Sequence, residues 1–232
     1  MQELLKNIWL NNTQKCVFCD KPEKNNICSN CRADLPWLEH CCHICALPLR
    51  SKATNLICKK CIEQRPHFNQ VIAAFNYRFP IDIAITKSKN EQQRQHLQWL
   101  GHLLTIRLMK HYTSSSMPQI IVPVPISAKK KLLKGYNQTQ QLTKIVGSKL
   151  NISYDDQVLA KVKDTPAQAT LTAKQRKKNL VGAFKANTHN YQHVAIIDDV
   201  LTTGSTANEL AKMLINSGVK TVDIWVLART PI

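Results

Sequence analysis

The chain has 232 residues, of which 44% are hydrophobic and 20% are charged, and its formal net charge is +17. This length is sufficient for one large or two small domains with a buried core. No apolar run reaches the roughly 18 residues of a membrane helix, and the apolar stretch in the first twelve residues is too short for a signal peptide. We therefore expect a cytoplasmic protein without membrane insertion.

The positive charge is concentrated in the middle of the chain. Residues 67–190 contain 19 Lys and Arg against five Asp and Glu. Such a balance attracts polyanions, among them nucleic acid, anionic lipid and phosphorylated metabolites. Because no amphipathic membrane anchor is evident, nucleic acid is favoured, and a basic surface that only aids solubility is the alternative.

All nine cysteines lie between positions 16 and 61, which is typical of metal binding or disulfides. Eight of them form C-x-x-C pairs: Cys16 with Cys19, Cys28 with Cys31, Cys42 with Cys45, and Cys58 with Cys61. Two such turns complete a closed tetrahedral zinc site, whose role is structural. Disulfides are the alternative, although cytosolic thiols are kept reduced.

The sequence leaves the pairing of these turns open. Sequential pairing gives one site from the first four cysteines and one from the last four, whereas cross-braced pairing alternates them. His40 and His43 are alternative ligands, and Cys41 is left over. We expect one or two zinc ions in a module at residues 1–66, followed by a second domain at 67–232.

The second domain predicts strands alternating with helices. A strand is expected within 67–79 before a turn at Pro80, and a helix at 91–111 carries an apolar stripe of Leu97, Leu100, Leu103, Leu104 and Leu108. Trp37 and Trp99 are expected to be packing residues, and stacking of Trp37 on a nucleic-acid base is the alternative. Residues 119–127, QIIVPVPIS, predict a strand whose prolines leave backbone groups free at the carboxyl end of a sheet.

The next stretch, KKKLLKGYNQTQQL at 129–142, is strongly basic. It predicts either a solvated loop or a segment that contacts phosphate, with Tyr136 as a stacking face, and its cations are Lys129, Lys130, Lys131 and Lys134. A helix is expected to continue through 142–150. Residues 161–184 combine many cations with weak periodicity, which predicts a mobile loop leading to a short strand at 181–185.

Residues 194–210, VAIIDDVLTTGSTANEL, predict a buried strand, an acidic pair, a hydroxyl-rich turn and a helix. A turn of this kind directs free backbone N–H groups at an anion, and the helix N-terminus adds favourable charge. Asp198 and Asp199 suit ribose hydroxyls or a hydrated magnesium ion. The combination fits a ribose 5-phosphate, and an ordinary βα unit with a polar turn is the alternative. Gly218 is expected to cap the helix, and residues 221–229 to form the last strand, in a mainly parallel sheet flanked by helices.

The 194–210 string resembles the 5-phosphoribosyl-1-pyrophosphate (PRPP) motif of type I phosphoribosyltransferases. With the C-x-x-C pairs, VPVP at 122–125, KGYNQ at 134–138 and TPAQATLTAKQRKKNLVGAF at 165–184, the chain resembles the ComF family from about residue 16 onward. The resemblance implies an α/β fold in which an N-terminal double zinc ribbon precedes a type I phosphoribosyltransferase-like domain. The chain departs from the family pattern at two places. Lys134 stands where the family commonly has an arginine. Lys87 or Lys89 corresponds to the lysine of a family segment that usually also contains a glycine, which is missing here.

The resemblance also implies roles for individual residues. PRPP would be held by Asp198, Asp199, Leu201, Thr202, Thr203, Gly204, Ser205 and Thr206. The turn at 124–127 would be the pyrophosphate loop, with Pro125 and Lys129 beside the ligand. The segment around Gln168, Arg176 and Asn179 would close over the site. Candidates for DNA contact are Lys129, Lys130, Lys131, Lys134, Arg176, Lys177 and Lys178.

The functional prediction that follows is a competence-associated protein of natural transformation and DNA uptake. It is expected to bind PRPP with magnesium and single-stranded DNA, with a competence-machinery helicase or another DNA-processing protein as a further partner. The alternative is an active phosphoribosyltransferase of nucleotide metabolism that transfers ribose 5-phosphate to an unidentified base or nucleophile. The sequence leaves open whether the chain is an enzyme, because no acceptor pocket is readable.

Overall fold

The structure, a computed structural model, describes residues 15–24, 26–51, 56–89, 95–113, 116–163, 180 and 182–231, apart from the side chain of Lys134. The chain divides into two compact units, one ending at Pro36 and the other beginning at Trp37. The first four cysteines of the C-x-x-C pairs lie in the first unit. The last four lie in the same unit as the sheet.

The first unit is built around two tight cysteine turns. The backbone N–H of Cys16 donates to the carbonyl of Lys21, and the only helix among the unit's described residues is α2, Ser29–Ala33. Cys16, Ile27 and Leu35 are buried although the unit is small. So few apolar side chains form a minimal core, which is consistent with metal supplying much of the folding free energy.

The second unit contains a four-stranded sheet, and all three strand pairings in it are parallel. Its strands are β1 (Gln70–Asn76), β2 (Ile120–Pro123), β5 (His193–Leu201) and β6 (Thr221–Arg229), in the order β1-β6-β5-β2. The central strand β6 is buried almost throughout, as expected when both faces of a parallel sheet are covered. The parallel sheet predicted from the sequence is confirmed.

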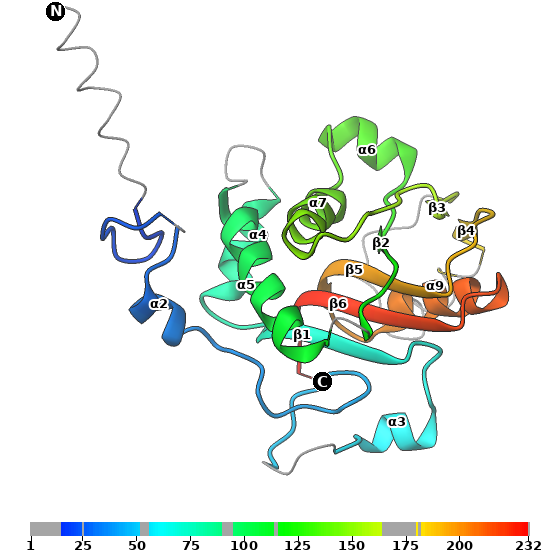
Figure 1. Ribbon diagram of the computed structural model, residues 1–232, viewed down its shortest axis with the longest axis horizontal. Coiled ribbons are helices and arrows are strands. Elements are labelled where there is room, and N and C mark those ends of the chain that lie inside the picture. The colour runs from blue at the N-terminus through cyan, green and yellow to red at the C-terminus, as the bar shows by residue number, and fades with distance from the viewer. Residues whose placement is uncertain are drawn as a thin grey trace, which may run out of the picture. The chain divides into compact units, whose positions relative to one another are not determined.

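Helices cover both faces of this sheet (Figure 1). Helices α5 (Gln95–His111) and α7 (Gln138–Leu150) pack together on one face, and α4 (Ile81–Ser88) packs on α5. On the opposite face, α9 (Ser205–Asn216) shares a hydrophobic cluster with inward residues of β5 and β6 and with the second set of cysteines. Among the described helices, none has the length and hydropathy needed to cross a membrane.

Three smaller elements complete the second unit. Helix α3, Lys59–Glu63, follows Cys58 directly. Strands β3 (Leu159–Lys161) and β4 (Phe184–Ala186) pair antiparallel, so the strand expected at 181–185 begins three residues later and has a partner that the sequence did not predict. Residues 164–179, which include Gln168, Arg176, Lys177, Lys178 and Asn179, lie outside the described part of the chain.

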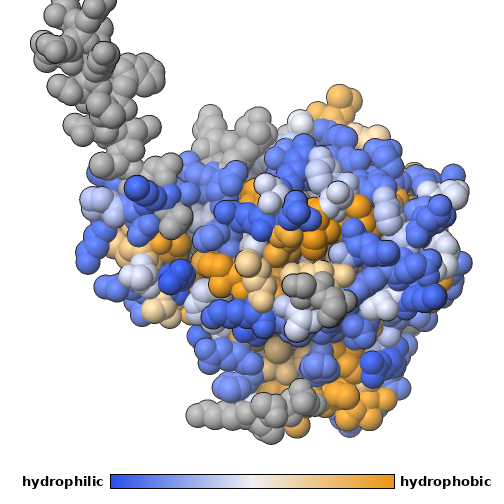
Figure 2. Space-filling view, viewed as in Figure 1, coloured by the Kyte–Doolittle hydropathy of each residue, from blue (hydrophilic) through white to orange (hydrophobic). Residues whose placement is uncertain are grey.

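The basic stretch after β2 forms helix α6, Ala128–Lys134, and not a loop. Its first turn is capped by Ser127, which accepts a hydrogen bond from the Lys130 N–H, and Gly135 ends it in the left-handed region at φ 72°. Leu132 and Leu133 are 86% and 76% exposed. Figure 2 shows hydrophobic side chains at the edge of the molecule where α6 lies. This helix therefore presents leucines among lysines to solvent.

Candidate functional site

The eight C-x-x-C cysteines form two separate groups of four. The Sγ atoms of Cys16, Cys19, Cys28 and Cys31 lie within 4.8 Å of one another, as do those of Cys42, Cys45, Cys58 and Cys61. Four sulfurs at about 2.3 Å from a tetrahedral zinc ion are about 3.8 Å apart. The Cys19–Cys28 and Cys45–Cys58 sulfur distances are 3.7 and 3.6 Å. Both groups therefore fit zinc, and the pairing is sequential.

Cross-braced pairing is excluded by this geometry, and neither histidine is needed. His40 and His43 are exposed and lie outside both groups, as does Cys41. Burial raises thiol pKa values, but backbone N–H donors outweigh it at two positions, where they lower the pKa of Cys16 to about 6 and that of Cys42 to about 7. Each group therefore offers a thiolate to a metal ion at neutral pH.

Asp198 and Asp199 lie near the carboxyl end of β5, which continues through them to Leu201. They open onto a cavity of about 220 Å³ whose other lining residues are Lys89, Val124, Ile126, Tyr136, Asn137, Gln138 and Thr139. Lys89 Nζ lies 3.3 Å from Asp199 Oδ2. The fold thus brings the acidic pair, the turn at 124–127 and the KGYNQ segment to one cavity.

Asn137, in the KGYNQ segment, and Thr139 shape this cavity, and neither was among the predicted binding residues. The Asn137 side-chain amide donates to the Val124 carbonyl at 3.2 Å, and the Thr139 hydroxyl donates to the same carbonyl at 2.7 Å. Both bonds fix the turn that follows β2. Of the two lysines compared with the family lysine, Lys89 lines this cavity and pairs with Asp199.

Asp198 is held in an environment that disfavours its charge. Burial and the neighbouring Asp199 carboxylate raise the pKa of Asp198 well above its usual value, although the Asp199 N–H donates to its carboxylate at 2.8 Å. A metal ion or a cation that approaches Asp198 would offset this cost. The carboxyl pair is therefore suited to binding a positively charged or hydroxyl-rich ligand.

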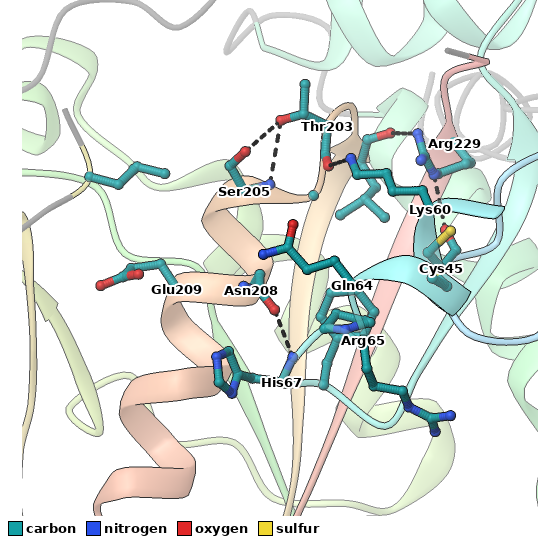
Figure 3. A pocket seen from close by; sticks show the side chains of 16 residues that line it. Cys45, Lys60, Gln64, Arg65, His67, Thr203, Ser205, Asn208, Glu209 and Arg229 are labelled. Carbon is teal, nitrogen blue, oxygen red and sulfur yellow. Dashed lines mark hydrogen bonds between the residues drawn. The ribbon is translucent and has the colours of Figure 1, made fainter. Parts of the chain in front are cut away.

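The hydroxyl-rich loop, residues 201–206, is held by its carbonyl groups. The Arg229 guanidinium donates to the carbonyls of Leu201 at 3.1 Å and Thr202 at 2.5 Å. Lys60 Nζ donates to the carbonyl of Thr203 at 3.3 Å (Figure 3). In a trans peptide the next N–H points away from the carbonyl. The N–H groups of residues 202, 203 and 204 therefore face away from both cations.

These three N–H groups have no hydrogen-bond acceptor among the residues that the structure describes. Gly204, at φ 78°, gives the loop its left-handed turn directly before α9, and the Thr203 and Ser205 hydroxyls are 2.9 Å apart. Consecutive free N–H groups at a helix N-terminus form an anion-binding concavity. Binding of a phosphate by this loop stays a prediction.

A second, larger cavity of about 490 Å³ adjoins this loop (Figure 3). Its walls are the second cysteine group with α3, the loop itself and the first turns of α9, and its polar side chains include Lys60, Gln64, Arg65, His67, Asn208 and Glu209. Thr203, Gly204 and Ser205 line this cavity, whereas the acidic pair lines the smaller one.

The other candidate residues are placed less centrally. Leu201 is buried and lines the larger cavity, while Thr202 is exposed. Lys129 and Lys131 are exposed on α6, Lys130 is half-buried there, and neither cavity has Lys129 or Pro125 in its lining.

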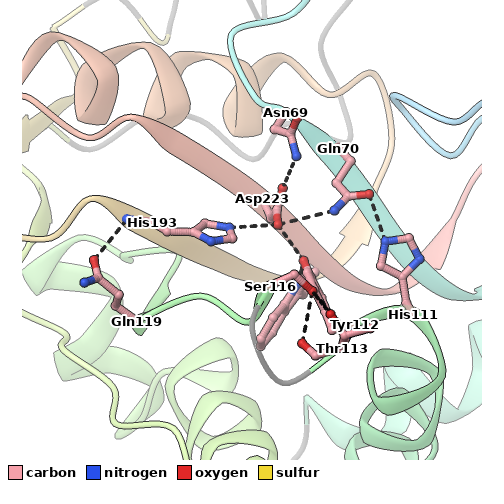
Figure 4. A network of polar contacts seen from close by, with 10 residues as sticks. Asn69, Gln70, His111, Tyr112, Thr113, Ser116, Gln119, His193 and Asp223 are labelled. Carbon is pink, nitrogen blue, oxygen red and sulfur yellow. Dashed lines mark hydrogen bonds and ion pairs between the residues drawn. The ribbon is translucent and has the colours of Figure 1, made fainter.

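A polar cluster at the opposite, amino-terminal edge of the sheet is separate from this site (Figure 4). Fully buried Asp223 accepts hydrogen bonds from Tyr112 at 2.6 Å and from Asn69 at 2.9 Å, and His193 Nε2 lies 3.0 Å from it. The Tyr112 hydroxyl also accepts from the indole N–H of Trp225 at 2.9 Å. The sequence did not reveal this cluster, because its members are far apart in the chain.

Comparisons with known proteins concern both the cysteine-rich segment and the whole chain. Residues 12–62 match the family model described as "Double zinc ribbon domain". The similarity of solved structures is weaker. Adenine phosphoribosyltransferase from Thermoanaerobacter pseudethanolicus is 16% identical, and the match covers 60% of this chain and 82% of that chain with a TM-score of 0.34. A similarity at this level carries no functional assignment.

Curated relatives match nearly the whole chain. Competence protein F from Haemophilus influenzae is 33% identical over 224 residues, which cover 93% of this chain and 96% of that protein. The DNA utilization protein YhgH from Salmonella typhimurium is 30% identical over 221 residues, with the same coverage. The protein described here therefore belongs to the ComF family of competence proteins.

Proposed function

We propose that this protein binds PRPP with magnesium and uses that site in the handling of single-stranded DNA during natural transformation. The observation that carries the proposal is the hydroxyl-rich loop, whose three free N–H groups precede the N-terminus of α9. A 5-phosphate supplies the anion that such a loop lacks. The acidic pair, Asp198 and Asp199, lies on β5 just before this loop and supplies acceptors for ribose hydroxyls.

Magnesium fits the donor set beside the loop. Asp198 and Asp199 offer carboxylate oxygens, which magnesium prefers, and Asp198 carries a charge that its surroundings disfavour. Bound with PRPP, the ion would neutralise charge on the pyrophosphate. Lys89 would then contact either Asp199 or the ligand, because it already reaches this cavity.

The role in DNA handling is supported by the relatives' names and by α6. The curated relatives are called competence and DNA utilization proteins. In this chain, exposed Lys129 and Lys131 flank half-buried Lys130, and the adjacent Leu132 and Leu133 are exposed. Lysines that contact phosphates beside apolar side chains that contact bases suit single strands. A helicase or another DNA-processing protein would supply or take up that strand.

Catalysis is the second candidate, and the larger cavity favours it. Its volume of about 490 Å³ is in the range of small-molecule sites, and it lies directly beside the loop. A base bound there would be an acceptor for the ribosyl group, with rate enhancement from positioning and charge stabilisation. The test is pyrophosphate release from PRPP with a panel of bases and nucleotides. Release with none of them would exclude this candidate for the panel tested.

Calorimetric titration with PRPP and magnesium tests the binding proposal. Because a hydrogen bond to a charged group contributes about 1.5–3 kcal/mol, the double change Asp198→Asn and Asp199→Asn should weaken binding by about 100-fold or more. Asp34→Asn, at an exposed site in the first unit, is the matched control and should bind like the wild type. A wild type that gives no binding heat, or a double variant that titrates normally, would refute the proposal.

A further inference from the structure

We propose that Arg229 and Lys60 are positioning residues that connect the second cysteine group to the hydroxyl-rich loop, so that zinc bound there sets the affinity of the loop for phosphate. The inference rests on the proposed function and deepens it. It concerns the second group of four, Cys42 to Cys61, and not the group in the first unit. The connection runs through one buried cation and one exposed cation, both of which bond to loop carbonyls.

Arg229 is the buried part of the connection. It ends the central strand β6 and is only 1% exposed. Its Nε donates to the Cys45 carbonyl at 3.0 Å, and the same guanidinium donates to the Leu201 and Thr202 carbonyls of the loop. One rigid, planar group thus bridges the metal-binding turn and the loop, which a flexible side chain would do less well.

The charge of Arg229 points to the same connection. Among the described residues its guanidinium has no ion pair with a carboxylate, and the oxygen atoms to which it donates are neutral carbonyls and one hydroxyl. A buried cation needs a counter-charge. Four thiolates around one zinc ion carry a net charge of about −2. The guanidinium donates to the backbone carbonyl of Cys45, which is one of the four cysteines of this group. The zinc-bound group is therefore the natural counter-ion of Arg229.

Lys60 is the exposed part of the connection. It lies on α3 next to the ligand Cys61, and its ammonium donates to the Thr203 carbonyl. The segment that follows α3 is fixed to α9 by the His67 N–H, which donates to Asn208 Oδ1 at 2.7 Å. Figure 3 shows Lys60, Arg229 and Thr203 converging at the upper end of the larger cavity.

These contacts set the direction of the loop's N–H groups. Each loop carbonyl that accepts a hydrogen bond from Arg229 or Lys60 points toward the second cysteine group, so the N–H of the following residue points away from it. Loss of zinc would release α3 and the turn at Cys45. The loop carbonyls would then lose their hydrogen bonds to Lys60 and Arg229, and the three free N–H groups would no longer point in one direction. By thermodynamic linkage, phosphate bound at the loop must in turn stabilise zinc in the second group.

The experiment measures zinc release from the full-length protein to a zinc-selective chromophoric chelator, with and without PRPP and excess magnesium. We expect PRPP to slow release from the second group about tenfold and to leave release from the first group unchanged. The change Cys28→Ser with Cys31→Ser removes the first group and identifies its kinetic phase. Lys60→Met should reduce the slowing to about twofold and weaken PRPP binding several-fold.

Lys59→Met is the matched control, because Lys59 lies on the same helix, is exposed and, among the residues that the structure describes, forms an ion pair only with Glu63, at 3.7 Å. It should behave like the wild type. Arg229→Met should have a larger effect than Lys60→Met, but the exposed Lys60 decides the test if the Arg229 variant does not fold. PRPP that binds by calorimetry without slowing zinc release would overturn this inference and leave the proposed function standing. Absence of PRPP binding would overturn the proposed function itself.

Discussion

Replacing Tyr112 by phenylalanine tests whether the Asp223 cluster stabilises the sheet. The hydroxyl donates to the buried carboxylate of Asp223 and accepts the indole N–H of Trp225. A hydrogen bond to a charged group contributes about 1.5–3 kcal/mol, and an orphaned buried donor costs about 1–3 kcal/mol. We therefore expect Tyr112→Phe to lower the free energy of unfolding by about 3 kcal/mol, a large part of the stability of a domain of this size.

Urea unfolding followed by tryptophan fluorescence, with zinc at fixed concentration, measures this loss. Tyr154→Phe is the control, because Tyr154 is 40% exposed and keeps its ring beneath Lys144, and it should change stability by less than about 0.5 kcal/mol. A loss below about 0.5 kcal/mol for Tyr112→Phe would refute the stabilising role of the cluster.

The pH dependence of the loss gives a second check. Burial raises the pKa of Asp223, but hydrogen bonds from His193, Tyr112 and Asn69 outweigh it and lower the pKa below its usual value. The charged form therefore stabilises the native state above the unfolded pKa of about 3.9, and this contribution disappears as the pH falls through the native pKa. The deficit of Tyr112→Phe should be full at pH 7 and shrink below about pH 4. A deficit that grows on acidification would contradict the reasoning.

Three further predictions concern the site and its surroundings. Because the pKa of Asp198 is raised, its protonated form stabilises the native state at low pH, and this contribution is lost as the pH rises. Asp198→Asn should therefore raise the melting temperature at pH 8 but not at pH 4. An unchanged or lower melting temperature at pH 8 would contradict this. Gly204→Ala and Gly218→Ala both place a Cβ in open space at positive φ, so each should lower the free energy of unfolding by about 1–2 kcal/mol. Only Gly204→Ala should also weaken PRPP binding measured by calorimetry. Equal affinities of the two variants would exclude the hydroxyl-rich loop from the PRPP site. Lys129→Glu with Lys131→Glu should weaken binding of single-stranded DNA and flatten its salt dependence by about 1.4 in slope, measured by fluorescence anisotropy, and an unchanged slope would place the DNA elsewhere.

The strands with continuous apolar runs were predictable from the sequence. The bounds of β6, Thr221–Arg229, are those expected from TVDIWVLAR, and the strand over Val194–Ile197 was also found. Strand β5 extends further, because the backbone of Asp198 and Val200 continues to pair with β6. The cysteine groups were predictable because the ligand spacing is local, while their pairing needed three-dimensional coordinates.

Short helices were not predictable in the same way. In α4 the alternation of Ile81, Ile83 and Ile85 favours a strand, yet the buried positions are Ile81, Ala84, Ile85 and Ser88, at helical spacing. Packing on α5 decides the outcome over local preference. Residues that act on the site over a long distance, such as Arg229 and Lys60, give no local signal at all. Their roles depend on the parallel sheet that brings the end of β6 beside the hydroxyl-rich loop.

The strand order has a consequence for how the protein is made. Strand β1 pairs with β6 alone among the four strands, and the facing residues Gln70 and Asp223 are 153 positions apart. During synthesis the cysteine groups, whose ligands are close in sequence, can fill with metal early, whereas β1 has no partner until β6 emerges. Sheets that depend on such distant pairing fold slowly. A ribosome-bound chain would therefore carry filled zinc sites before its sheet is complete, and the hydroxyl-rich loop would gain its contacts with Arg229 only when β6 joins the sheet.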